Sequence, residues 1–135
     1  MKSIELLAPA KDLQAAVAVG DPGAHALNVG GARFGARHAA GNSAEEIARA
    51  VEYAHQYGVR VHATLNTLLY DGELAEAERQ ARELIAAGVD ALIVADLGAF
   101  TLAGKYAPRC QRHISTQQSI ANHVCAQAWY DLGAS

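Results

Sequence analysis

The sequence predicts an α/β fold of five consecutive βα units, with parallel strands that form part of a TIM-like (β/α)8 barrel. Three observations lead to this fold class. Five apolar runs have the length of buried strands, helical segments alternate with them, and each run ends in polar residues, proline or glycine. Such alternation gives a parallel sheet with right-handed crossovers, either an open doubly wound sheet or most of a barrel. The polar strand ends favour the barrel, because barrel enzymes bind substrates on that face.

The predicted strands share one layout, an apolar run followed by a polar or turn-forming end. They cover residues 4–8, 26–29, 59–65 and 89–95 and the stretch 112–118. The first four end at Pro9, Gly30-Gly31, Asn66 and Asp96. The last stretch, RHISTQQ, changes from a short apolar-flanked run to a series of hydrogen-bonding side chains. A binding site is therefore expected where these ends meet, with substrate at the C-terminal ends of the strands.

The helices are expected from their capping residues as well as from their apolar stripes. Ser43 and Glu46 form a capping box, in which each side chain satisfies an amide group that the first helical turn leaves free. The expected helix starts lie near Asp12, Ser43, Asp71, Leu97 and Asn122. Residues 1–135 are read as a single domain. The chain ends where another strand is expected, which suggests the N-terminal part of a longer barrel.

Composition excludes several classes of protein. The net charge is −3, so the chain has no general excess of positive charge to hold a phosphate backbone, although a local basic patch stays open. Cys110 and Cys125 match no zinc or iron–sulfur spacing. No apolar run approaches the roughly 18 residues that cross a bilayer, and no leader peptide precedes the first strand. We expect a cytoplasmic protein with reduced thiols and no membrane segment.

Three residues are candidates for catalysis, each with an ordinary structural alternative. Asp96 ends a strand where barrels place catalytic side chains, but it can equally cap the helix that begins at Leu97. His113 can act as an acid or base near neutral pH, whereas a structural role with satisfied hydrogen bonds suits most of the six histidines better. Ser115 can be drawn into a triad with a histidine and Asp96, but the sequence supplies no geometry for it.

Four further residues are candidates for binding substrate. Arg37 lies in the loop of residues 32–42, where a guanidinium suits a carboxylate or phosphate, or merely a salt bridge to a neighbouring loop. Asn66, Thr116 and Gln117 offer neutral hydrogen bonds at strand ends. Thr116 and Gln117 can instead cap the strand and the helix that follows. No metal site is predicted, because the histidines occur singly.

Five short motifs occur in an order that is similar to a known family. They are ELLAPA at 5–10, VGG at 29–31 with FGAR at 34–37, TLNT at 64–67, DLG at 96–98 and HISTQ at 113–117. Together they resemble the N-terminal part of the collagenase-like peptidases, family U32. This resemblance implies a TIM-barrel-like N-terminal half and peptidase activity of unsettled mechanism. Related branches hydroxylate a pyrimidine of tRNA or ribosomal RNA, or act in ubiquinone synthesis with an iron–sulfur cluster.

The resemblance leaves three functional hypotheses. The first is the N-terminal segment of a peptidase, a hydrolase acting on a peptide or protein. The second is a factor for RNA hydroxylation or ubiquinone synthesis; no cofactor is expected within this chain, because the cluster-binding cysteines of those branches lie beyond residue 135. The third is an inactive binding or assembly fragment. Five strands cannot close an eight-stranded barrel, so self-association through the open sheet edges is expected.

Overall fold

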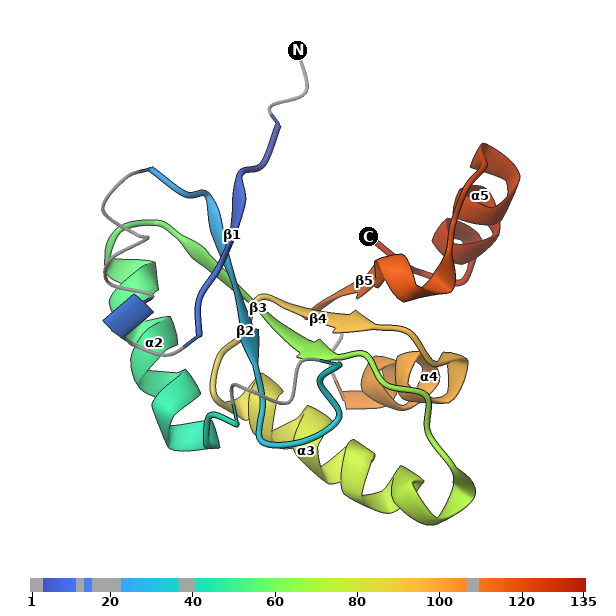
Figure 1. Ribbon diagram of the computed structural model, residues 1–135, viewed down its shortest axis with the longest axis horizontal. Helices are drawn as coiled ribbons and strands as arrows, with labels where there is room; N and C mark the ends of the chain where they lie inside the picture. The colour runs from blue at the N-terminus through green and yellow to red at the C-terminus, as the bar shows by residue number, and fades with distance from the viewer. Residues whose placement is uncertain (1–3, 12–13, 16–22, 37–40, 107–109) are drawn as a thin grey trace.

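The computed structural model describes residues 4–11, 14–15, 23–36, 41–106 and 110–135. Its centre is one sheet of five strands in the order β1-β2-β3-β4-β5, with every neighbouring pair parallel (Figure 1). The strands are β1 (Leu7–Pro9), β2 (Ala26–Gly30), β3 (Arg60–Leu65), β4 (Ala91–Val94) and β5 (Gln111–Ile114). The sheet is open, which confirms the expected α/β fold and partial barrel.

Capping interactions fix where the helices begin. They are α2 (Ala44–Gln56), α3 (Leu74–Ala86), α4 (Leu97–Tyr106) and α5 (His123–Asp131), with 3-10 turns η1 (Asp71–Glu73) and η2 (Thr116–Gln118). The Ser43–Glu46 capping box is present, because the Ser43 amide donates to Glu46 Oε2 at 2.7 Å and the Glu46 amide donates to Ser43 Oγ at 3.2 Å. Asn122 caps α5 by accepting the Cys125 amide at 2.9 Å. Both predicted caps are confirmed.

Some predicted bounds were wrong. The strand expected over 112–118 ends at Ile114, because the Ser115 side chain accepts the Gln117 amide and turns the chain into η2. The helix expected to open at Asp71 begins with η1, and α3 starts at Leu74. The expected strand over residues 4–8 is displaced to Leu7–Pro9. The start of the first predicted helix, at Asp12, lies outside the described residues.

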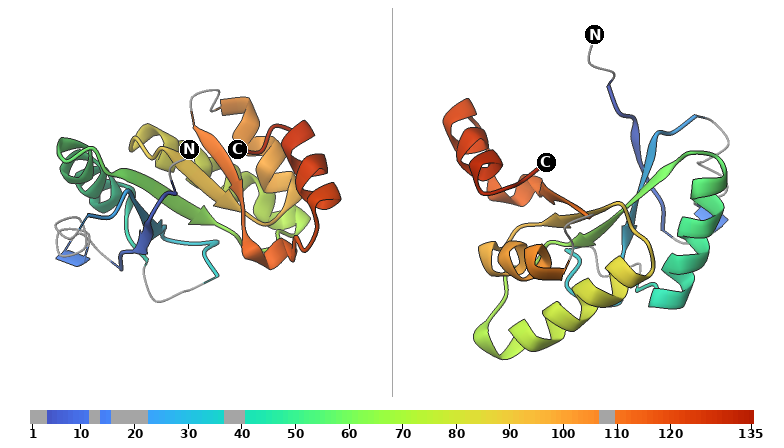
Figure 2. Two further views of the ribbon diagram at one scale, coloured as in Figure 1. Left: turned by 90° about the horizontal axis from the view of Figure 1, so that it is seen from above. Right: turned by 180° about the vertical axis from the view of Figure 1, so that it is seen from behind.

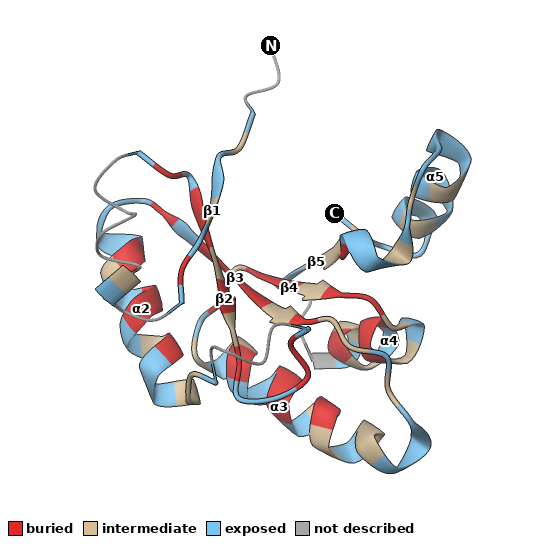
Figure 3. Cartoon of the chain, viewed as in Figure 1, coloured by how far each residue is buried: buried red, intermediate tan, exposed pale blue. Residues whose placement is uncertain are grey.

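The two faces of the sheet carry different side chains because neighbouring strand residues point to opposite sides. One row packs against α2, α3 and α4 and forms the apolar core. Its buried members from the strands are Leu27, Val29, Val61, Ala63, Leu65, Leu92 and Val94. The other row, on the helix-free face, includes Asn28, His62 and Ala91, which the strand register places side by side. His113 lies on the same face, paired with Ile93 one layer closer to the carboxyl edge. Figure 3 shows the buried residues concentrated in β2, β3 and β4.

Helix α5 is attached at one end of the sheet and is largely exposed. Figures 1 and 2 show it at the opposite end of the molecule from α2. Its contacts with the rest include the Phe100–Trp129 ring pair, with centroids 5.4 Å apart, and the Arg112 guanidinium, which donates to the Gly133 carbonyl at 3.3 Å. Exposed apolar side chains remain at Val124, Tyr130 and Leu132. Within the described residues, no helix has both the length and the apolar character needed to cross a membrane.

The capping box gives a stability prediction. Replacing Ser43 with alanine removes the acceptor for the Glu46 amide, so the free energy of unfolding should fall by about 1 kcal/mol, as measured by urea unfolding followed by circular dichroism. Ser135→Ala is the matched control, since this residue is exposed at the chain end. An equal loss in both variants would contradict the role assigned to the cap.

Candidate functional site

Three chain segments meet at the carboxyl edge of the sheet, and Asn66 joins them. Its Oδ1 accepts the Ala36 amide at 2.9 Å, and its Nδ2 donates to Ser115 Oγ at 3.4 Å. The Asn66 amide also donates to the Phe34 carbonyl at 2.8 Å. The structure therefore brings together two of the predicted site residues, Asn66 and Ser115, and ties them to the loop that follows β2.

Ser115 and Gln118 are occupied with holding the edge together. Ser115 is only 5% exposed, and its Oγ accepts the Gln117 amide at 3.4 Å in addition to the Asn66 side chain. The Gln118 side-chain amide donates to the Ala95 carbonyl at the end of β4. Thr116 and Gln117, by contrast, are exposed on η2. Internal hydrogen bonds thus hold the chain at this edge in place, and two neutral side chains are exposed to solvent there.

Asp96 takes the structural role that was its alternative. Its Oδ1 accepts the Ala99 amide at 2.9 Å, and its carbonyl accepts the Phe100 amide at 2.9 Å. It therefore caps the start of α4. Within the described residues, Ser115 Oγ has no histidine or aspartate among its hydrogen-bond partners, so the triad that can be drawn from the sequence is not assembled.

The loop after β2 contains two arginines, of which the structure describes Arg33. Arg37 lies outside the described residues. Arg33 forms an ion pair with Glu76 on α3, and its guanidinium lies 4.9 Å from the centre of the Phe34 ring. The Arg33 side chain is 54% exposed, and ion pairs between exposed side chains are weak.

Gln80 supports this loop and was missed by sequence reasoning. It is 7% exposed on α3, accepts the Arg33 amide at 3.1 Å through Oε1 and donates to the Arg33 carbonyl through Nε2. A side chain on Gly31 would come within 2.8 Å of Gln80 Nε2, so glycine permits the close approach. The available signal was a polar residue on the apolar stripe of Ala77, Ala81 and Leu84.

A histidine pair lies on the helix-free face, below the carboxyl edge. The rings of His62 and His113 meet edge to face, with centroids 4.7 Å apart and an interplanar angle of 90°. His62 is fully buried, and within the described part of the chain neither of its ring nitrogens has a hydrogen-bond partner. His113 Nε2 lies 3.2 Å from Gln111 Oε1. His62 is thus an exception to the expectation that most of the histidines are structural with satisfied hydrogen bonds.

Burial favours the neutral form of both rings. Burial lowers the pKa of His62 below its usual 6.5, and the nearby His113 lowers it further. Burial likewise lowers the pKa of His113. Glu5 opposes these shifts, and its Oε1 lies 3.8 Å from His62 Nε2. The sequence signal for His62 was a histidine in the middle of an otherwise apolar strand.

The two cysteines do not fit an iron–sulfur cluster. Burial raises the pKa of the Cys110 thiol to about 11, which disfavours the thiolate that a metal requires. Cys125 lies on α5, and Cys110 belongs to the core on the helix-covered face. Within the described part of the chain, no group of three or more histidine, cysteine, aspartate or glutamate side chains is arranged to hold a metal ion.

The histidine pair makes stability depend on pH. Because both pKa values lie below 6.5, the unfolded chain binds more protons than the folded chain as the pH falls below that value. The contribution of the pair to the free energy of unfolding should be constant above about pH 6.5 and decrease toward acid pH. Urea unfolding at a series of pH values should show a shallower acid loss for a His62→Asn/His113→Asn variant. His123→Asn, on exposed α5, should keep the original slope.

Several known proteins are similar to this chain in sequence. The chain is 44% identical over 130 residues to a 23S rRNA 5-hydroxycytidine C2501 synthase of Escherichia coli (strain K12). The matching region covers 96% of this chain and 19% of that protein. It is 36% identical over 133 residues to tRNA hydroxylation protein P1 of Bacillus subtilis (strain 168), covering 98% of this chain and 32% of that protein. A collagenase of Porphyromonas gingivalis (strain ATCC BAA-308 / W83) is 27% identical over 124 residues, or 90% of this chain and 30% of the collagenase.

These relatives correct the expected activity. The peptidase reading, with its peptide or protein substrate, is contradicted because the relatives with 44% and 36% identity carry names for RNA hydroxylation, while the collagenase is more distant at 27%. Residues 11–135 match Peptidase family U32. The chain belongs to this family.

Proposed function

We propose that this chain is the N-terminal part of a protein that hydroxylates a pyrimidine in RNA. The observation that carries the proposal is the 44% identity, over 96% of the chain, to a protein named as a 23S rRNA 5-hydroxycytidine synthase. The chain spans 19% of that relative and 32% of tRNA hydroxylation protein P1. The activity therefore belongs to a longer protein, in which this segment contributes one part of the site. An RNA substrate also supports a cytoplasmic location.

The carboxyl edge is suited to recognising a base by neutral hydrogen bonds. Thr116 and Gln117 are exposed there, and η2 is held in place by Ser115 and Gln118. Amide and hydroxyl groups read the edges of bases that are not paired in a duplex. The net charge of −3 gives this segment no general attraction for phosphates, so the edge contributes recognition more than electrostatic affinity.

A deletion strain tests the proposed reaction. Mass spectrometry of total ribosomal RNA and tRNA should show the loss of a hydroxylated pyrimidine on deletion and its return with the full-length gene. A Thr116→Ala/Gln117→Ala variant should restore about one fifth of the modification rate or less, because one hydrogen bond contributes about 1 kcal/mol. Gln56→Ala, at the exposed end of α2, is the control and should restore it fully. RNA with unchanged hydroxylation in the deletion strain would refute the proposal.

We also propose that the 135-residue chain associates with itself when it is produced alone. In the described residues, β1 and β5 are the edge strands of the sheet, and α5 exposes Val124 and Tyr130 at 66% and 69%. Exposed sheet edges and apolar side chains favour association. Multi-angle light scattering should report a mass above 14.2 kDa that increases with concentration. A compact monomer at all concentrations would rule out this behaviour.

A further inference from the structure

His25 joins the chain entering β1 to the start of β2 by two hydrogen bonds. Its backbone amide donates to the Leu6 carbonyl at 2.9 Å, and the Leu6 amide donates to Nδ1 of the His25 ring at 2.8 Å. β1 begins at the next residue after Leu6, and β2 begins at the next residue after His25. The imidazole therefore holds the first strand where it enters the sheet.

The same pair of bonds occurs at the start of β4, with an aspartate in place of the histidine. The Asp90 amide donates to the Val61 carbonyl at 2.8 Å, and the Val61 amide donates to Asp90 Oδ2 at 2.7 Å. His25 and Asp90 each lie two residues after a glycine with positive φ, Gly23 and Gly88, and directly before a strand. In both βα units the side chain at this position accepts the amide of the neighbouring strand.

The two acceptors differ in how they respond to acid. A backbone amide only donates, so Nδ1 of His25 accepts with a lone pair and the ring is neutral. A protonated imidazole carries a proton on both nitrogens and offers the Leu6 amide no acceptor. A carboxylate, which ordinarily takes up a proton at about pH 4, keeps its acceptor oxygens where imidazole titrates. Of the two arrangements, the one with the imidazole is therefore the one that a proton breaks near neutral pH.

We propose that His25 is a pH-sensitive latch for the chain entering β1. With a neutral ring, the latch holds the Leu6 amide against the start of β2. The His25 side chain belongs to an exposed residue, so a proton from solvent can bind to Nδ1. The Leu6 amide then faces a donor, its hydrogen bond is lost and the amide is released to water. This latch is independent of the proposed RNA hydroxylation.

Other contacts limit the release to the entry of β1. The Leu6 carbonyl still accepts the amides of His25 and Ala26, at 2.9 and 3.2 Å, whether or not the ring is protonated. β1 itself stays paired with β2 through the register of residues 7–9 with residues 26–28. Protonation should therefore free one amide and loosen the segment before β1, and leave the sheet folded.

The charged groups at this end of the sheet pair with one another. The chain entering β1 carries Glu5 and β3 carries Arg60, and these two form an ion pair. His55 of α2 lies 2.9 Å from Asp90. Among the described residues, no ion pair involves the His25 ring. Glu5 Oε1 also lies 3.8 Å from Nε2 of His62, so the segment that the latch holds is the one beside that buried ring.

Amide hydrogen exchange of the 135-residue chain, followed residue by residue by NMR, tests the latch. Protection of the Leu6 amide, corrected for the intrinsic effect of pH on exchange, should fall about fivefold from pH 8 to pH 5, because one hydrogen bond is lost. The midpoint should coincide with the titration of the His25 ring in the same sample. The Val61 amide, which Asp90 accepts, is the internal reference, because it reports any general loss of stability in acid.

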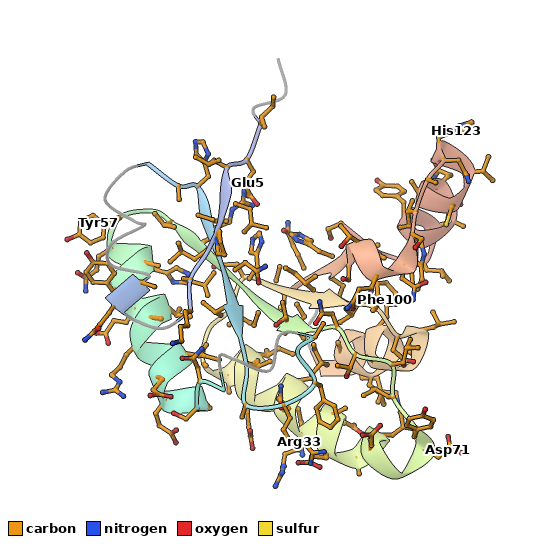
Figure 4. The ribbon with its side chains drawn as sticks, viewed as in Figure 1. Glu5, Arg33, Tyr57, Asp71, Phe100 and His123 are labelled. Carbon is orange, nitrogen blue, oxygen red and sulfur yellow. The ribbon has the colours of Figure 1, made fainter. Side chains whose placement is uncertain are left out.

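A carboxylate at position 25 separates the latch from other effects of acid. His25→Asp should keep the Leu6 amide protected across the same pH range, as Asp90 does for Val61. His123→Asn, on α5, should show the same acid loss as the unchanged chain; Figure 4 shows His123 far from Glu5. The latch is overturned if Leu6 protection relative to Val61 does not fall in the unchanged chain. It is equally overturned if the loss persists in His25→Asp.

Discussion

The register between the parallel strands is the constraint on which the rest of the structure depends. Each strand places one row of side chains against α2, α3 and α4 and the alternate row on the helix-free face. A shift of one residue in any pairing would exchange these rows, moving valine and leucine out of the core. The apolar row therefore holds the polar row in register. The placement of His62 beside His113 follows from packing on the opposite face.

The same register explains which side chains at the carboxyl edge are hydrogen-bonded internally and which are exposed. Asn66 and Ser115 follow β3 and β5 and lie close enough to bond, while the loop after β2 reaches them through the Ala36 amide. Gln80 reaches the same loop from the helix-covered side. The polar groups that support the edge are thus engaged in internal hydrogen bonds. Thr116 and Gln117 are exposed on η2, the turn that Ser115 caps.

Local features of this structure were predictable from the sequence, and long-range ones were not. The Ser43 capping box and the Asn122 cap depend on residues three positions apart, so their pattern is sufficient to predict them. The parallel pairing also follows from the βα alternation, and the polar strand ends favoured the barrel-like order over a doubly wound sheet. The surroundings of His62 could not be read from local sequence because its neighbours come from distant segments: Glu5 precedes β1 and His113 belongs to β5. Gln80 was missed for the same reason, since its role depends on Arg33 in a distant loop.

The activity was harder to predict than the fold because the diagnostic motifs serve the scaffold. In the HISTQ motif, Ser115 caps a turn, and Asp96 of the DLG motif caps α4. Asn66 of the TLNT motif braces a loop. Such residues do not identify the reaction, since any chemistry at this edge needs the same support. The chemical distinction between a hydrolase and an RNA-modifying protein therefore rests on groups that the scaffold does not need. His62 is one such group among the described residues, because its buried ring has no hydrogen-bond partner there and so costs the fold stability instead of adding to it.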